Sequence, residues 1–448
     1  MAYGEVLRPQ YHFTPEKEWM NDPNGLVYDH GEYHLFFQHS PGSMVHGPTT
    51  WGHAVGTELV HWEQIHHAAL DEDDMGWIWS GSAVTDHQNT SGFQTGQNPP
   101  LIAIYTVGDT SSTPRKPCTQ CIAYSNDRGR TWTKYDGNPV IGHIRAENRD
   151  PKVVWHASSR QWIMALFLHE NDYRLFASDD LKTWEPLQDL TLPGVSECPD
   201  LFELPVDGNL SDKRWVFWGA NGGYIVGRFD GRLFTPETEV LHAETGANGY
   251  AAQTWSDIPP DDGRRVQISW MAGGKYPAMP FNQQMSFPVE LTLRSMPDGI
   301  RLFRQPVREI ELLHKTSRSW FNEARVEGSR LIIAEKGDLF DVRMGIEVNR
   351  KTVFEIEVQG HLLVYDAGHK TISGFGKSAP LRTIDDRVEL QLLVDRTSLE
   401  IFGNNGEVSM SFCFLPEAAN YPLALHSDVG SFLARNLTVH ELRSAWRV

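Results

Sequence analysis

Three acidic residues, Asp22, Asp150 and Glu197, stand in similar local sequences although they are far apart along the chain. They occur in the motifs Trp-Met-Asn-Asp22-Pro-Asn-Gly, Arg-Asp150-Pro and Glu197-Cys-Pro-Asp, each with a proline within the next two residues. Polar segments that contain proline form turns. A single Asp before Pro is most often a turn residue. Three carboxyl groups brought together could instead bind a metal ion or carry out acid–base and nucleophilic catalysis.

These acids belong to a longer repeat of about 50 to 70 residues, a period that suggests a propeller or another repeat array. Each repeat opens on a small or polar turn, enters a short strand and continues into a second, more apolar strand. The five openings are Asn21-Asp-Pro23, Ser80-Gly-Ser-Ala83, Arg149-Asp-Pro151, Glu197-Cys-Pro-Asp200 and Gly249-Tyr-Ala-Ala252. The second strands are expected at residues 33–38, 101–107, 162–168, 215–219 and 266–271.

Five units of three or four strands, with almost no helical periodicity, predict an all-β fold built on a five-bladed β-propeller. A large β-sandwich or a β-helix is the alternative from the repeat alone. In a propeller the first strand of each blade lines the central channel, so the blade openings meet at one end of the axis. This arrangement would bring Asp22, Asp150 and Glu197 within contact range.

The blade pattern stops near residue 296, where turn-forming residues mark a boundary. We expect the propeller to span residues 1–296, a connector to span 297–318 and a second domain to span 319–448. In that last segment short alternating strands are separated by turns, including Asn404-Asn-Gly406, which is typical of a hairpin. The pattern predicts a C-terminal β-sandwich. We expect it to pack against the propeller, since no cluster of aromatic residues stands out in it.

The composition favours an enzyme that acts on a neutral substrate. The net charge is −18, from 40 basic and 58 acidic residues, which argues against nucleic acid or an anionic membrane as a partner. No apolar run approaches the roughly 18 residues of a membrane span, and no leader is recognised at the start. We therefore expect a cytoplasmic protein, with secretion after removal of a leader as the alternative. The oligomeric state is not predicted, and a homodimer stays open.

Metal binding is not favoured by the spacing of the candidate ligands. Cys118-Thr-Gln-Cys121 has the spacing of half a zinc site, but the other two cysteines are solitary. His30 and His34 are four residues apart, yet they fall across an expected hairpin turn rather than on a helix. No Asp-rich loop of calcium-binding spacing occurs. We expect neither a metal ion nor a cofactor.

Glycoside hydrolysis is the remaining use of clustered carboxyl groups, because it needs one ionised and one protonated acid near neutral pH. Crowding of like charges should raise the pKa of one acid, whereas Arg149 is expected to keep its neighbour Asp150 ionised. Side chains that suit sugar binding also occur near the expected openings. These are Trp19, Asn21, Gln38, Trp51, Trp79, Ser80 and Trp270.

The chain resembles glycoside hydrolase family 32, the β-fructofuranosidases, which include invertases, exo-inulinases and levanases. The three acid motifs stand in the family's order. Three further motifs look like those of the family: Trp51-Gly-His-Ala54, Ser80-Gly-Ser-Ala83 and Leu393-Val-Asp-Arg-Thr-Ser-Leu-Glu-Ile-Phe402. The resemblance covers nearly the whole chain. It implies a five-bladed propeller followed by a β-sandwich, in agreement with the repeat.

The resemblance also implies roles for the acids. Asp22 would be the nucleophile, Glu197 the general acid/base, and Asp150 would hold two hydroxyl groups of the fructosyl unit. A retaining mechanism is implied, which predicts the Asp22 and Glu197 carboxyl groups about 5–5.5 Å apart. Cys198 is expected to tune the neighbouring acid as a weak hydrogen-bond partner. The terminal fructose would be bound by Asn21, Gln38, Trp51, Ser80 and Arg149, with Tyr250 and Trp270 as looser matches.

We therefore expect an exo-acting β-fructosidase that removes terminal fructose from levan, inulin and sucrose. Residues 39–50 and Trp77-Ile-Trp79 differ from the sequence that is common in the family. The resemblance implies that both segments lie where the leaving group should bind. Residues 277–282 are similar to the version in levanases and exo-inulinases. The alternatives are a fructosyltransferase of the same family and a fructan-binding protein that has lost its activity.

Overall fold

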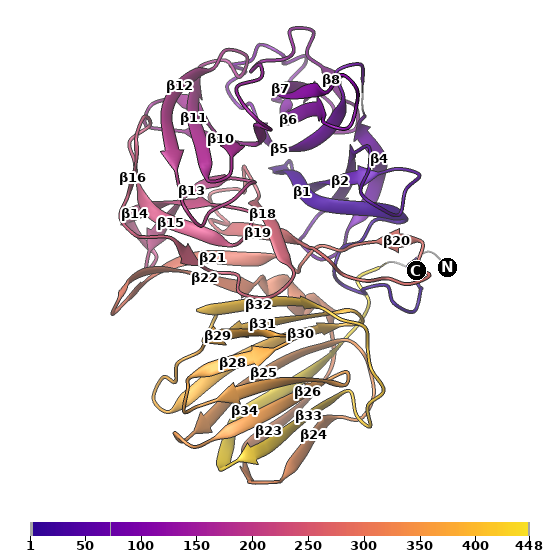
Figure 1. Cartoon of the computed structure of the whole chain (residues 1–448), viewed down its shortest axis with the longest axis vertical. Helices are drawn as coiled ribbons and strands as arrows, with labels where there is room; N and C mark the ends of the chain where they lie inside the picture. The colour runs from indigo at the N-terminus through magenta and orange to yellow at the C-terminus, as the bar shows by residue number, and fades with distance from the viewer. Residues whose placement is uncertain (1–2, 72, 447–448) are drawn as a thin grey trace.

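The computed structural model describes residues 3–71 and 73–446, and it has two domains made almost entirely of β-strands (Figure 1). The N-terminal domain is a five-bladed β-propeller and the C-terminal domain is a β-sandwich, which confirms the predicted fold class. Among the described residues the single helical element is a short 3₁₀ helix, η1 (Arg308–Leu313), at the junction of the domains. No described helix is long and apolar enough to cross a membrane.

The first three blades are antiparallel sheets of consecutive strands. Blade 1 contains β1 (Glu18–Asp29), β2 (Glu32–Ser40), β3 (Thr50–Gly56) and β4 (Glu63–Leu70). Blade 2 contains β5 (Trp77–Thr85), β6 (Leu101–Asp109), β7 (Lys116–Ser125) and β8 (Thr133–Lys134). Blade 3 contains β9 (Arg149–His156), β10 (Gln161–His169), β11 (Asp172–Ser178) and β12 (Glu185–Thr191). The first strands of neighbouring blades, β1, β5 and β9, contact one another in that order and so line the centre of the propeller.

The last two blades share one continuous sheet, because β13 makes a short parallel contact with β21. Blade 4 contains β13 (Asp200–Val206), β14 (Asn209–Trp218), β15 (Gly223–Phe229), β16 (Phe234–Pro236) and β17 (Leu241–His242). Blade 5 contains β18 (Gly249–Thr254), β19 (Arg265–Met271), β21 (Val289–Met296) and β22 (Gly299–Pro306). Four of the five expected second strands lie within β2, β6, β10 and β19, and the fifth, 215–219, extends one residue past the end of β14.

Strand pairing in blade 5 continues past residue 296, where the sequence predicted the end of the propeller. Residues 299–306, which were expected in the connector, form β22, and β22 pairs antiparallel with β21 from Val289↔Pro306 to Met296↔Gly299. The Pro-Asp pair at 297–298 is therefore the tight turn of a hairpin within blade 5 rather than a break between domains. The connector is correspondingly short, since η1 ends at Leu313 and the first sandwich strand begins at His314.

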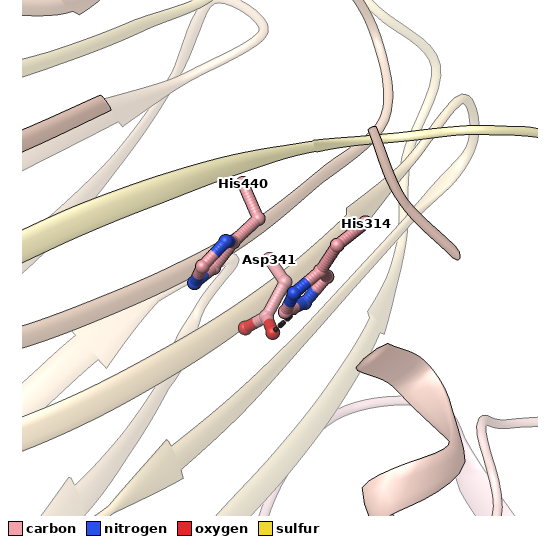
Figure 2. A group of neighbouring side chains, drawn as sticks. All are labelled: His314, Asp341 and His440. Atoms are coloured by element: carbon pink, nitrogen blue, oxygen red, sulfur yellow. Dashed lines mark hydrogen bonds and ion pairs between the residues drawn. The ribbon is translucent and has the colours of Figure 1, made fainter. Parts of the chain in front are cut away.

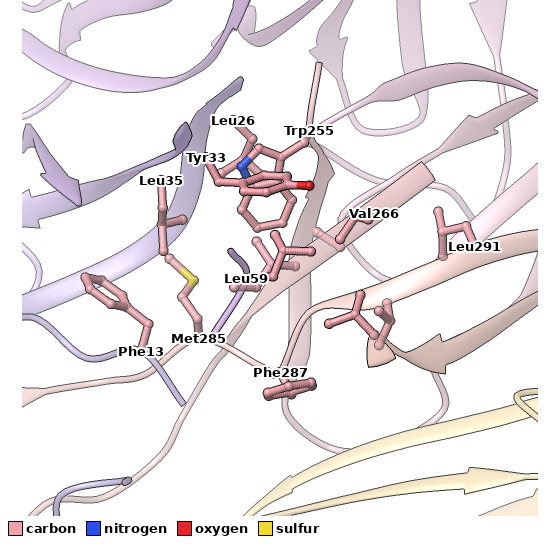
Figure 3. Packing of buried hydrophobic residues seen from close by; sticks show 14 of the residues in the cluster. Phe13, Leu26, Tyr33, Leu35, Leu59, Trp255, Val266, Met285, Phe287 and Leu291 are labelled. Carbon is pink, nitrogen blue, oxygen red and sulfur yellow. The ribbon is translucent and has the colours of Figure 1, made fainter. Parts of the chain in front are cut away.

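Blades 1 and 5 are closed against each other by strand pairing and by a shared apolar core. β20 (Phe281–Asn282) returns from blade 5 and pairs parallel with the start of β1. In the shared core, the Trp255 indole lies among the side chains of Leu26, Tyr33 and Val266 (Figure 3), and its Nε1 donates to the carbonyl of His34 at 2.9 Å. This closure fixes the first and last blade openings around one axis.

The sandwich consists of two six-stranded sheets that enclose a separate core. One sheet contains β23 (His314–Val326), β34 (Ser431–Leu442), β25 (Phe340–Val348), β30 (Arg387–Asp395), β31 (Ser398–Gly403) and β32 (Val408–Cys413). The other contains β24 (Arg330–Ala334), β33 (Leu423–Val429), β26 (Val353–Val358), β27 (His361–Asp366), β28 (Thr371–Gly374) and β29 (Lys377–Pro380).

The edge strand β32 faces the propeller (Figure 1). The backbone N–H groups of Thr245 and Ala247 donate to the carbonyls of Ser409 and Ser411 at 3.0 and 3.1 Å. Gly246 lies between them, and a Cβ there would come within 2.2 Å of the Ser411 nitrogen. The sandwich therefore packs tightly against the back of blade 5.

Candidate active site

The blade openings carry irregular strand pairing that aims their side chains at the propeller axis. The register shifts between Met20 and Pro23 in β1, between Ile78 and Gly81 in β5, between Arg149 and Lys152 in β9, and between Tyr250 and Gln253 in β18. A β-bulge inserts an extra residue and turns its side chain out of the regular alternation. Among the described residues, the bulged positions thus include Asp22, Ser80, Asp150 and Ala251.

Backbone conformation at two of the acids is unusual for residues with a side chain. Asp150 has φ 62° and Glu197 has φ 46°, both in the left-handed region. Such conformations cost energy in residues other than glycine and cluster at functional sites. The backbone is also closely packed at Gly81, because a Cβ there would come within 2.1 Å of the Ile104 carbonyl oxygen.

The structure brings the three acids together around the Cys198 thiol. Cys198 Sγ lies 3.8 Å from Asp22 Oδ2 and 3.5 Å from Asp150 Oδ2, and Glu197 is the preceding residue. The Cys198 backbone N–H also donates to Asp150 Oδ2 at 3.3 Å. Residues from blades 1, 3 and 4 therefore meet at one end of the axis, as the repeat predicted.

Glu197 stands on the wall of a pocket of about 520 Å³. Arg149 donates from a guanidinium nitrogen to Glu197 Oε1, and the Tyr250 hydroxyl donates to Glu197 Oε2 at 2.5 Å. The guanidinium also lies over the Phe167 ring, 5.0 Å from its centroid. Glu197 keeps 31% of its side chain exposed, so these contacts orient a carboxyl group that still faces solvent.

Asp22 is held by a different set of partners. The Ser80 hydroxyl donates to Asp22 Oδ2 at 2.6 Å. Burial raises the pKa of Asp22, while hydrogen bonds from Ser80 and Asn21 lower it in part. Asp22 and Glu197 thus differ in their hydrogen-bond partners, and Glu197 is the acid that lines the pocket.

The expectation that Arg149 keeps Asp150 ionised is wrong in its net effect. Burial raises the pKa of Asp150 to about 7; Arg149 opposes this, while Asp22 and Glu197 add to it. The Arg149 side chain lies 3.6 Å from Asp150 Oδ2, but its hydrogen bond goes to Glu197. Desolvation of a carboxyl group that is only 7% exposed therefore outweighs one neighbouring cation.

Most of the other predicted binding residues surround these acids. Asn21 and Gln38 are buried, with exposures of 7% and 3%, and Gln38 Nε2 has no hydrogen-bond partner among the described residues. Trp270 contacts Trp19 and Tyr250 edge to face, with ring centroids 6.1 and 6.3 Å apart. The half-buried Trp79 directs its Nε1 to the Gly108 carbonyl at 3.0 Å.

Trp51 does not occupy the predicted position on the pocket wall. It has no exposed surface, packs against Phe36 and Tyr105, and donates from Nε1 to the Trp79 carbonyl at 2.9 Å. β3 is buried along its full length, so the indole is enclosed between blades 1 and 2. Trp51 therefore supports the backbone beside Ser80 instead of offering a surface to a ligand.

Two charged residues below the acids were not singled out from the sequence. Lys152 and Asp200 are buried, with exposures of 1% and 0%, and their side chains lie 3.5 Å apart. Lys152 Nζ donates to the Thr254 carbonyl at 2.7 Å, and Asp200 accepts from the Thr254 N–H at 2.6 Å. They tie β9, β13 and β18 together beneath Asp150 and Glu197. The sequence feature that could have identified Lys152 is its position at the start of an apolar strand, directly after the Arg-Asp-Pro motif.

Cys198 offers a test of how the thiol affects the acids. In the Cys198→Ala variant, loss of the Sγ donor should raise the pKa of Asp22 and Asp150. The acidic limb of kcat/KM against pH should then move to higher pH by about half a unit, since a weak thiol hydrogen bond contributes less than ~1 kcal/mol. Cys198→Ser, which keeps a donor, should move the limb in the opposite direction. Unchanged pH profiles in both variants would exclude this role.

Both domains match models of one known protein family. A family model described as glycosyl hydrolases family 32 N-terminal domain matches residues 12–306, and a model of the family 32 C-terminal region matches residues 312–441. A levanase of Bacillus subtilis (strain 168) is 40% identical over 99% of this chain and 72% of the levanase. An extracellular exo-inulinase of Aspergillus niger is 33% identical over 99% of this chain and 96% of its own.

Solved structures agree with the sequence matches. The crystal structure of an exo-inulinase from Aspergillus awamori superposes with a TM-score of 0.87 at 30% identity and covers 100% of both chains. A fructofuranosidase from Schwanniomyces occidentalis in complex with fructose also reaches a TM-score of 0.87, at 28% identity over 99% of this chain and 100% of its own. The protein therefore belongs to glycosyl hydrolase family 32 and is a glycoside hydrolase.

Proposed function

We propose that this glycoside hydrolase is a retaining, exo-acting β-fructosidase that hydrolyses terminal β-D-fructofuranosyl residues of fructans and sucrose. The observation that carries the proposal is that Asp22 and Glu197 meet at the Cys198 thiol, each with separate hydrogen-bond partners. Asp22 is buried against Ser80, whereas Glu197 is oriented by Arg149 and Tyr250 and stays partly exposed. A nucleophile and a general acid/base need such different surroundings.

In the proposed first step, the Asp22 carboxylate attacks the anomeric carbon while Glu197 gives its proton to the leaving oxygen. The bond to the leaving group breaks, and a fructosyl ester of Asp22 forms. In the second step Glu197 removes a proton from water, the water oxygen attacks the same carbon, and Asp22 departs as a carboxylate. Two successive inversions at one carbon retain its configuration.

The proposed role of Asp150 is to hold two hydroxyl groups of the fructosyl unit, next to the reacting carbon. Its backbone is fixed by a hydrogen bond from its N–H to Thr106 Oγ1 at 3.0 Å. Gln38 supports the same site, because a buried amide with a free Nε2 is ready to donate to a sugar hydroxyl. Asn21, Ser80, Trp79, Tyr250 and Trp270 complete the proposed surroundings of the terminal fructose.

The substrate class is inferred from the names of the relatives. The relatives include proteins named levanase, exo-inulinase and invertase. The pocket beside Glu197, of about 520 Å³, lies in the usual range for small-molecule sites, roughly 300–1,000 Å³. Exo action is proposed from the relative named exo-inulinase.

Trapping the intermediate with methanol would test the retaining mechanism. Hydrolysis of sucrose in the presence of methanol should yield methyl β-D-fructofuranoside, because methanol replaces water in the second step. This product does not change configuration after release, so NMR reads the stereochemistry directly. Methyl α-D-fructofuranoside as the main product would contradict the retaining assignment.

Product analysis separates the proposed hydrolase from its alternatives. Inulin and levan should release free fructose from the first time points, with kcat/KM for each compared with that for sucrose. Oligosaccharides as the first products would contradict exo action. Transfer products outpacing free fructose at high sucrose would identify a fructosyltransferase, and absence of turnover on all three substrates would identify a binding protein.

A further inference from the structure

Two histidines and one aspartate meet in the sandwich domain (Figure 2), whereas the acids of the active site belong to the propeller. The Asp341 carboxylate and ring nitrogens of His314 and His440 all lie within 4.8 Å of one another. Among the described residues this is the one group of three or more such side chains with that spacing. The residues come from β25, β23 and β34, so strand pairing and not sequence spacing brings them together.

The pairing register explains why the three side chains share a face. Asp341 stands directly opposite His440 in the β25–β34 pair, and residues directly opposite each other lie on the same side of a sheet. His314, the first residue of β23, comes in from the other side of β34 and stacks on His440, with ring centroids 3.8 Å apart. Because η1 ends one residue earlier, the group lies at the exit of the interdomain connector.

We propose that His314, Asp341 and His440 form a binding site for a divalent transition-metal ion of the zinc type. Two imidazoles and one carboxylate are a common three-residue ligand set for Zn²⁺, with water in the fourth position. Asp341 has no exposed surface, while the two imidazoles are partly exposed and leave a path for an ion. The site would join the start of β23 to β34 and β25, the next two strands of its sheet.

The hydrogen bonds around the group suit this role. His314 Nε2 lies 3.0 Å from Asp341 Oδ2, so an ion would replace the proton that these two atoms share. The Ser317 hydroxyl lies 2.7 Å from His440 Nδ1 and can accept from it, which leaves the Nε2 lone pair for a metal. Gln391 Nε2 donates to Asp341 Oδ1 at 2.9 Å and orients the carboxylate from behind.

Two features of the geometry must change when an ion binds. Tetrahedral Zn²⁺ with bonds of roughly 2.0–2.2 Å needs each ligand atom directed at the ion. The two imidazole planes are nearly parallel, at 6°, so one ring must tilt out of the stack. Arg343 also lies 2.8 Å from Asp341 Oδ2 and competes for that oxygen. Arg343 has a second partner in Glu311, at 3.1 Å, which can hold it after displacement.

Calorimetric titration of the untagged chain with ZnCl₂, after dialysis against a chelator, tests the site. We expect one ion per chain. Affinity should rise from pH 6 to pH 8, because binding displaces a proton. His314→Ala and His440→Ala should each weaken binding at least about tenfold, since even the outer partners of metal ligands change affinity by 10–100-fold. Arg343→Met should strengthen binding by removing the competing cation.

His369→Ala is the matched control, because His369 is 83% exposed in the same domain and pairs with Asp366 at 2.7 Å. It should leave Zn²⁺ affinity unchanged. Circular dichroism of each variant verifies folding. Wild-type binding no tighter than that of the His314→Ala variant, or equal loss of affinity in the His369→Ala variant, would overturn the proposal. An unchanged or weaker affinity in Arg343→Met would also count against the assigned ligand set.

Discussion

Replacing Asp22 by Asn should lower kcat/KM on sucrose and on fructans by about four orders of magnitude or more, the range found when an enzyme's nucleophile is removed. Asn has nearly the same shape, so the hydrogen-bonding position beside Ser80 is preserved. It cannot form the fructosyl ester, because its amide is not a carboxylate. The effect should appear mainly in kcat, since Asp22 is proposed to act on the reacting carbon.

The control for this variant is Asp136→Asn, which makes the same chemical change at an exposed turn outside the site. It should retain wild-type activity. Both variants should unfold at temperatures close to that of the wild type, measured by Trp fluorescence. Loss of less than about tenfold in kcat/KM for Asp22→Asn, with no contaminating wild-type enzyme, would remove Asp22 from the nucleophile role.

The second large effect is expected at the junction of the two domains, from His12. Its side chain is fully buried between two carboxylates of the sandwich: Nδ1 lies 2.9 Å from Asp395 Oδ2 and Nε2 lies 2.8 Å from Glu400 Oε2. Replacing His12 by Ala would leave two buried acids without their cation. Breaking a buried ion pair in this way costs about 3–5 kcal/mol of unfolding free energy.

The pH dependence of stability gives this prediction a distinct signature. Burial alone would lower the pKa of His12, but its hydrogen bonds with Asp395 and Glu400 raise it to about 9 from 6.5. The folded chain therefore holds this proton more tightly than the unfolded chain. The resulting stabilisation, about 3 kcal/mol, is fully present below pH 6.5 and is lost as the pH rises through about 9.

Urea unfolding at a series of pH values from about 6 to 10 would measure this loss. The difference in unfolding free energy between wild type and His12→Ala should shrink as the pH rises. His369→Ala, at an exposed position of the sandwich, should track the wild type. A difference between wild type and His12→Ala that stays constant over the whole range would show that His12 acts by packing and not by its charge.

The sequence was sufficient for the overall fold because the information for blades is local. Apolar alternation and turn residues repeat within each blade, and only a few strands are needed to complete one unit. In a propeller, residues at equivalent positions of the repeat lie close together around the axis. The acid motifs at equivalent blade openings therefore predicted that Asp22, Asp150 and Glu197 meet. The same local information did not distinguish a hairpin from a linker near residue 296, because Pro297-Asp298 is a turn signal in both, and in the structure it joins β21 to β22.

Tertiary structure alone decided the surroundings of those residues. The pKa of Asp150 depends on how much water the assembled blades exclude, and the enclosure of Trp51 depends on packing between blades 1 and 2. The Lys152–Asp200 tie, the His12 contacts and the group formed by His314, Asp341 and His440 join residues from different strands or domains. Periodicity is a property of neighbours in sequence, whereas desolvation and side-chain contact arise only after distant strands pack, so the motifs predicted which acids meet but not the environment in which they meet.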